Sequence, residues 1–142
     1  MLTAQSLVGA WTLLEWQVES AESGRIAWPF GRDAEGLIVY SANGWMSATL
    51  SERTRTALSA ASMRQADEAT RARVATEYLA YSGRWSLEGE TVVHRVTLSL
   101  NPVLIGTEQR RRAELAGSEL TLSASETDAG KTRIHRLRWL RP

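Results

Sequence analysis

The chain has 142 residues, 43% of them hydrophobic and 23% charged, which is enough for one domain with a substantial core. Seventeen basic side chains nearly balance sixteen acidic ones, so no overall field attracts nucleic acid or an anionic membrane surface. Cysteine is absent, which excludes disulfides and thiolate metal sites, and no segment approaches the roughly 20 apolar residues of a membrane-spanning helix.

The N-terminal segment has no features of an export signal and leads into a first strand. Residues 1–8 contain neither a basic stretch nor a long apolar stretch, so we expect a cytoplasmic protein. The aromatic and branched side chains of residues 11–18 predict a strand. Apolar side chains lie on both of its faces, which indicates either burial on both sides or a β-bulge.

A loop and a hairpin follow the first strand. Trp28 and Phe30 flank a proline in the loop, and two large aromatics are not typical of a solvated connection, so we expect them to cover apolar groups. Gly36–Tyr40 has the composition of a strand. Asn43-Gly44 is a strong hairpin signal, and Trp45–Leu50 alternates as the returning strand.

Residues 59–81 differ in character from the rest of the chain. They are rich in alanine and contain neither glycine nor proline. Their larger side chains recur at helical spacing, which predicts one amphipathic helix of about five turns. Ser62 is the expected N-cap, with Gln65 as its capping-box partner, and Gly83 is expected to mark the end of the helix. The stripe consists of Met63, Thr70, Val74, Tyr78 and Tyr81.

From residue 84 onward the sequence returns to alternation. We expect strands at Trp85–Leu87, Thr91–Leu100, Thr107–Leu115, Glu119–Ser125 and Thr132–Leu140. The whole chain then has eight or nine sequential antiparallel strands and one inserted α-helix, over a single domain of residues 1–142. Short sequential hairpins favour a closed meander barrel, which leaves no exposed edges, over a two-sheet sandwich.

Six segments share their order and spacing with a known family. They are Leu7–Trp11, Pro29–Gly31, Gly36–Ala48, Tyr81–Trp85, Val93–Val96 and Gly106–Arg111. In this order they resemble the lipocalin-like domain family of bacteria and fungi. The resemblance implies an antiparallel calycin-type β-barrel with an interior cavity, in which the tryptophan of the Gly9-Ala10-Trp11 motif closes one end. It implies no particular substrate. We expect the helix to pack against the barrel.

His94 is the most informative single residue for function. It lies in the middle of an expected strand and shares a face with Val96, Leu98 and Leu100, which predicts that it points into the barrel. A histidine in an apolar pocket can bind a ligand oxygen or act as a general base. The alternative is a buried neutral histidine that is hydrogen-bonded to a neighbour.

Gln109 and Arg111 share the face of the next strand that we expect to line the interior. An inward arginine is costly without an anionic partner, so Arg111 either meets an anionic ligand or pairs internally with Glu15 or Glu108. The opposite register would place its two arginine neighbours inside instead. With glutamates on their face, those neighbours fit a solvated, charge-balanced surface rather than a nucleic-acid site.

We therefore expect a protein, either monomer or homodimer, that binds a small hydrophobic or aromatic molecule in its lumen without a cofactor or metal. One alternative is a cofactor-free cyclase or isomerase of a secondary-metabolite pathway, with His94 as acid–base group and Arg111 as oxyanion partner. Another is a structural module whose barrel is filled by its own side chains. The candidate ligand contacts are Trp28, Phe30, Tyr40, Trp45, Tyr81, His94, Gln109 and Arg111.

Overall fold

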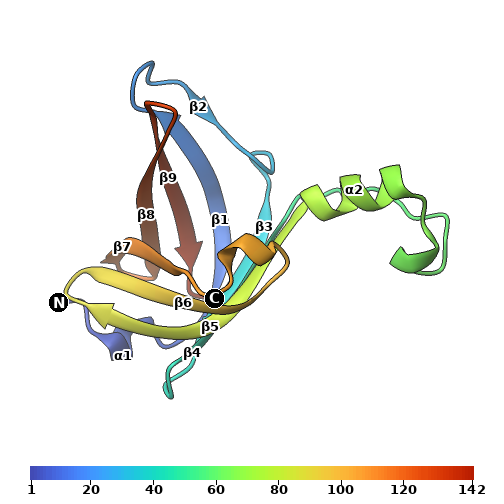
Figure 1. Ribbon diagram of the computed structural model, residues 1–142. Coiled ribbons are helices and arrows are strands. Elements are labelled where there is room, and N and C mark those ends of the chain that lie inside the picture. Colours follow the sequence, from blue (N-terminus) through green and yellow to red (C-terminus); the bar gives the residue numbers. More distant parts are fainter.

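The computed structural model describes residues 1–142 and has nine antiparallel strands, eight of which close into a barrel (Figure 1). The strand order is β2-β1-β3-β4-β5-β6-β7-β8-β9, and pairing of β1 with β9 closes the sheet. The structure confirms the predicted all-β barrel and its sequential connectivity. The strands are β1 (Gly9–Ser20), β2 (Ile26–Ala27), β3 (Glu35–Tyr40), β4 (Trp45–Ser51), β5 (Tyr78–Glu88), β6 (Thr91–Ser99), β7 (Glu108–Ala116), β8 (Glu119–Asp128) and β9 (Lys131–Leu140).

The two ends of the barrel differ in how they are covered. The tight turns β3–β4, β5–β6 and β7–β8 lie at one end together with the short helix α1 (Ala4–Leu7), and we call this the closed end. Trp11 is fully buried there. Its indole N–H donates to the Leu7 carbonyl at 3.0 Å, and the Arg141 guanidinium lies 4.1 Å from its ring. Gly9 adopts a φ of 127°, which only glycine tolerates readily.

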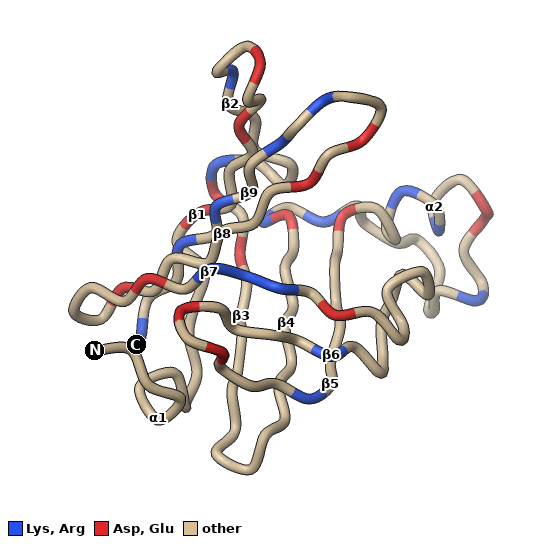
Figure 2. The backbone as a smooth tube through the Cα atoms, turned by 60° about the vertical axis from the view of Figure 1, so that its left-hand side comes forward, with Lys and Arg blue, Asp and Glu red and all other residues tan.

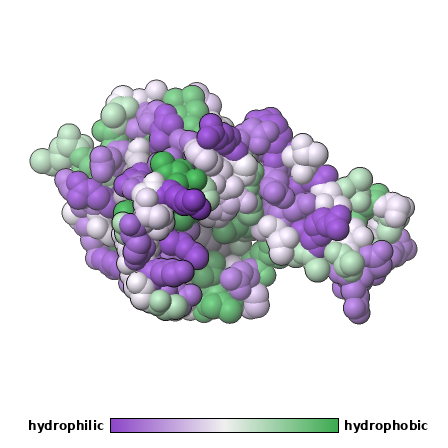
Figure 3. Space-filling model, turned by 90° about the horizontal axis from the view of Figure 1, so that it is seen from above, coloured by the Kyte–Doolittle hydropathy of each residue, from purple (hydrophilic) through white to green (hydrophobic).

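The opposite end, which we call the open end, carries the longer connections. These include the single-turn helix η2 (Pro102–Leu104) between β6 and β7, and residues 52–77 between β4 and β5. Residues 52–77, here called the arm, contain the 3₁₀ turn η1 (Met63–Gln65) and the helix α2 (Glu68–Thr76). The arm projects sideways from the barrel, and its surface is largely hydrophilic (Figures 1 and 3). The expectation that a helix packs against the barrel is therefore wrong.

The helix itself is also shorter than predicted from the sequence. Its nine residues begin after Asp67, whose carboxylate caps the helix by accepting the Thr70 N–H at 2.7 Å, whereas Ser62 makes no capping hydrogen bond. From Tyr78 the chain is a strand, because β4 and β6 supply pairing partners on both sides. That pairing outweighs the helical spacing of the tyrosines. Neither α-helix has the length and apolar character needed to cross a membrane.

Two β-bulges set which side chains face inward. One falls between Leu13 and Glu15 of β1, as the apolar groups on both faces of that strand indicated. The other lies in β6 at Thr97, the unpaired residue between Val96 and Leu98, which pair with Gly83 and Ser82 of β5. Two expectations for this region are wrong. Gly83 lies within a strand and ends no helix, and Leu98, beyond the bulge on β6, is exposed instead of sharing the inward face of His94.

Candidate functional site

A cavity of about 480 Å³ lies inside the barrel toward the open end. Eleven of the nineteen residues around it are hydrophobic, so its wall is mainly apolar. Four of the eight residues that we predicted as ligand contacts line it: Tyr81, His94, Gln109 and Arg111. The hydrophobic part of the wall includes Trp16, Ile38, Ala48, Leu50, Leu79, Leu104, Leu122, Ala124, Leu137 and Trp139.

His94 lies in the inner part of the cavity wall and is 1% exposed. Both of its ring nitrogens are occupied: Nε2 lies 2.7 Å from the Tyr40 hydroxyl, and Nδ1 lies 2.7 Å from the Tyr81 hydroxyl. Burial, and secondarily the positive charge of Arg111, lowers the pKa of His94 to about 3. The ring is therefore neutral near pH 7, and neither nitrogen is free to accept a further proton.

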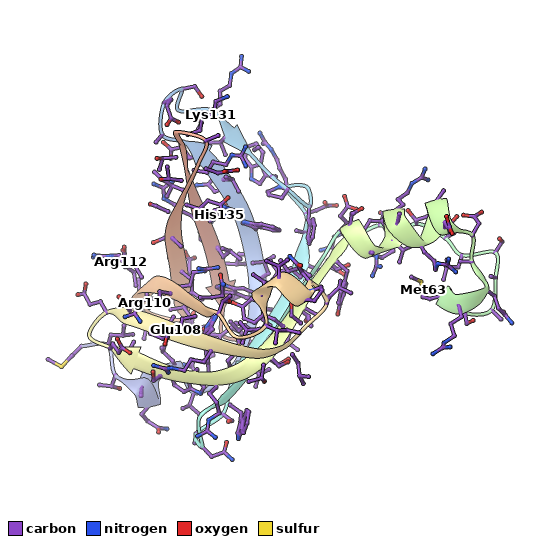
Figure 4. All side chains as sticks on the ribbon, in the orientation of Figure 1. Met63, Glu108, Arg110, Arg112, Lys131 and His135 are labelled. Atoms are coloured by element: carbon purple, nitrogen blue, oxygen red, sulfur yellow. The ribbon has the colours of Figure 1, made fainter.

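The alternation of β7 places Gln109 and Arg111 inside and their arginine neighbours outside, as we predicted. Arg110 and Arg112 extend away from the barrel (Figure 4), and each contacts two glutamates. Figure 2 shows the basic run of β7 with acidic residues on either side of it along the chain. Arg111 has no carboxylate within ion-pair distance. Its guanidinium donates only to the Arg110 carbonyl at 3.1 Å and to Gln109 Oε1 at 3.3 Å. The alternative of an internal pair with Glu15 or Glu108 is therefore wrong, because both glutamates bind other arginines.

Trp16, Glu126 and His135 form a second polar group of the wall, near the open end, that sequence reasoning missed. The Trp16 indole N–H donates to His135 Nδ1 at 3.3 Å, which leaves Nε2 as the other polar atom of the ring. This nitrogen lies 3.2 Å from Glu126 Oε1 but lacks the alignment of a hydrogen bond. His135 projects inward from β9 (Figure 4). Its alternation with Leu137 and Trp139 was the signal that could have placed it.

The remaining predicted contacts do not line the cavity. Tyr40 is buried behind His94. Phe30 packs edge-on against Trp16, with ring centroids 5.1 Å apart, and so supports the wall from behind. Trp28 donates to Glu15 Oε2 at 2.9 Å. Trp45 lies on the outer face of β4, half exposed beside Arg84, and this position removes it from the candidate site.

The charged and titratable groups do not form a metal centre. The structure brings together no group of three histidine, aspartate or glutamate side chains that could hold a metal ion. The polar atoms of the cavity instead suit an organic ligand, since hydroxyl, guanidinium and indole groups form hydrogen bonds that fix the orientation of an otherwise apolar molecule.

Comparison with known proteins agrees with this architecture. No curated protein matches the sequence. A family model described as a lipocalin-like domain matches residues 8–141, which is nearly the whole chain, from the segment before Gly9 to the end of the strand that closes the barrel. With its closed antiparallel barrel and internal cavity, the chain belongs to the lipocalin-like domain family.

Proposed function

We propose that the protein binds one small hydrophobic or aromatic molecule inside the barrel. The observation that carries this proposal is the cavity, whose volume of about 480 Å³ lies within the range of roughly 300–1,000 Å³ typical of small-molecule sites. Its apolar wall favours a ligand with a hydrophobic body. His94, Gln109 and Arg111 belong to the polar part of the wall and would orient that ligand.

The two alternatives have less support from the same geometry. A cavity of this size argues against a barrel filled by its own side chains. A cyclase or isomerase that uses His94 as its acid–base group would need a ring nitrogen free to exchange a proton with the substrate. Both nitrogens are held by tyrosine hydroxyls, and the low pKa keeps the ring neutral. The geometry of His94 therefore favours binding over catalysis by this residue.

The direct test is native mass spectrometry of the purified protein before and after extraction into organic solvent. We expect a small-molecule adduct on the native protein that disappears on extraction, or uptake of one molecule per chain from a mixture of lipophilic metabolites. Neither an adduct nor uptake would contradict the proposal.

A cavity-filling substitution locates the bound molecule. Ala124 lines the cavity, so Ala124→Phe places a ring in the space of the ligand and should weaken its binding about ten-fold or more. Ser123, the preceding residue of β8, does not line the cavity, and Ser123→Phe is the matched control with unchanged affinity. Affinity is measured by fluorescence titration with an apolar dye. Equal affinities in the two variants would place the ligand elsewhere.

A further inference from the structure

The inner part of the cavity carries an unusual excess of hydrogen-bond donors. The register places Arg111 opposite Val92 of β6 and Trp139 opposite Leu13 of β1, both toward the closed end of the barrel. Trp139 lines the cavity, and its indole N–H is buried without a partner. A buried donor left unpaired costs roughly 1–3 kcal/mol, which a ligand acceptor in contact with it would recover.

The hydroxyl of Tyr81 is a further donor, and His94 determines its direction. A neutral imidazole has one N–H donor and one acceptor nitrogen, so one of the two tyrosines donates to His94 and the other accepts from it. Tyr40 is 1% exposed, and its hydroxyl contacts only His94. If Tyr40 accepted, its own O–H would be left unpaired in the core, at a cost that selects against this arrangement.

Tyr40 therefore donates to His94 Nε2, and His94 Nδ1–H donates to the Tyr81 oxygen. Tyr81 then keeps its own O–H free, and Tyr81 lines the cavity. The hydrogen-bonded chain Tyr40–His94–Tyr81 therefore determines that the Tyr81 hydroxyl faces the ligand as a donor and not as an acceptor. Tyr40 acts through the other two and is a positioning residue.

Arg111 supplies the positive charge of the inner part of the cavity. It is the inward member of three consecutive arginines, and unlike its two neighbours it has no glutamate partner. A guanidinium inside a mainly apolar wall is stabilised by an anion that shares the site. Of the acceptors on the same strand, Gln109 Oε1 is already bonded to the guanidinium, and the Glu108 carboxylate, which also borders the cavity, pairs with Arg95 and Arg110. Guanidinium, O–H and indole N–H therefore offer donors only.

We propose that this inner site recognises an anionic oxygen, so that the ligand is an apolar molecule with one carboxylate, phenolate or enolate group. Arg111 supplies the charge, Tyr81 and Trp139 donate hydrogen bonds, and the chain from Tyr40 through His94 orients the Tyr81 hydroxyl. This inference rests on the proposed binding function, and it adds the charge of the ligand and the direction in which it lies, with its anionic end toward the closed end of the barrel.

The test uses two fluorescent probes that share one apolar body, anilinonaphthalene sulfonate and the neutral phenylnaphthylamine. We expect the wild-type protein to bind the anionic probe about ten-fold or more tightly than the neutral one, because hydrogen bonds to charged groups are the stronger ones. Arg111→Met should abolish this preference by weakening the anionic probe far more than the neutral one. Arg112→Met, on the outer face of the same strand, is the matched control that keeps the preference.

Tyr40→Phe tests the positioning role. Without the Tyr40 donor, His94 Nε2 loses the bond that fixes its tautomer, and the Tyr81 hydroxyl turns to donate to His94 Nδ1 instead of to the ligand. The preference for the anionic probe should fall several-fold, although Tyr40 does not line the cavity. Tyr78→Phe, which removes a hydroxyl that does not line the cavity, is the control. A loss of stability alone would lower affinity for both probes together.

The outcomes separate this inference from the proposed function. If the wild-type protein binds neither probe, both are wrong. If it binds both probes equally, or if Arg111→Met lowers both affinities by the same factor, the binding function stands and the anion site is refuted. If Arg111→Met abolishes the preference but Tyr40→Phe retains it, the positioning role of Tyr40 is refuted. Should Tyr40→Phe fail to fold, the wild-type ratio and Arg111→Met still decide the anion site.

Discussion

His94 links the chemistry of the cavity to the pH dependence of folding. Its pKa is about 3 in the folded protein and near 6.5 in an unfolded chain, so between these values only the unfolded chain binds a proton. The free energy of unfolding should therefore fall as the pH drops below about 6.5, by up to roughly 1.4 kcal/mol per pH unit. Chemical denaturation followed by circular dichroism at a series of pH values measures this slope.

His94→Gln is the control for that slope. The amide keeps a donor and an acceptor for the two tyrosines but has no charge to gain. Glutamates with lowered pKa values, such as Glu15 and Glu119, lose their stabilising contribution mainly below their ordinary value of 4.5. The interval between about pH 6.5 and pH 5 should consequently become flat in the variant. An unchanged slope there would mean that His94 does not stay neutral in the folded protein.

Strand alternation predicted the inward direction of His94, Gln109 and Arg111 correctly, because β6 and β7 pair without a bulge over these residues. The partners of His94 could not be predicted in the same way. Tyr40 is 54 residues away in sequence, and its approach depends on how far the strands tilt around the barrel. Alternation therefore indicates direction, while the contacts between strands follow only from the closed structure.

At the level of elements, Gly83 of β5 lies opposite the bulge in β6. A Cβ at this position would overlap the carbonyl oxygen of Arg95 on β6, which is backbone and cannot move aside. Gly83→Ala should lower the free energy of unfolding by about 3 kcal/mol. Gly117→Ala, in the β7–β8 turn, has open space around its Cβ but a φ of 61°, and should cost roughly 1 kcal/mol. Equal costs in urea denaturation would show that β5 shifts to make room.

The same element shows why the helix was predicted too long. An alanine-rich segment with apolar residues at intervals of three and four predicts a helix from local spacing alone. Tyr78 and Tyr81 continue that spacing, but they belong to β5, which pairs with β4 from Tyr78 and with β6 from Tyr81 onward. Gly83 likewise resembles a helix terminator in the sequence and serves a close approach between strands in the structure. Pairing partners distant in sequence decided both cases.

For the whole molecule, closure of the barrel could be predicted and its cavity could not. Eight sequential strands with tight turns leave two edges that pair most simply with each other, and β1 and β9 do so over most of their lengths. Arg138 of β9 reinforces this seam by contacting Glu15 of β1 and Glu119 of β8. The volume inside depends on the sizes of side chains that meet across the barrel, and that information is absent from the order of strands.

The contrast between the two ends of the barrel leads to a prediction for two tryptophans. Trp11 is fully buried at the closed end, outside the cavity, whereas Trp45 is about half exposed on the outer surface. Trp11→Ala should lower the free energy of unfolding by about 3–5 kcal/mol, because it leaves a void beneath Arg141 and removes the bond to Leu7. Trp45→Ala should cost less than about 1 kcal/mol.

Probe binding completes this test, since neither tryptophan lines the cavity. At temperatures where Trp11→Ala is still folded, its affinity for an apolar probe should match that of the wild-type protein. Stability is followed by circular dichroism in urea, because the substitutions themselves change the tryptophan fluorescence. A loss of affinity in folded Trp11→Ala would mean that packing at the closed end determines the shape of the cavity, so that stability and binding are coupled along the barrel axis.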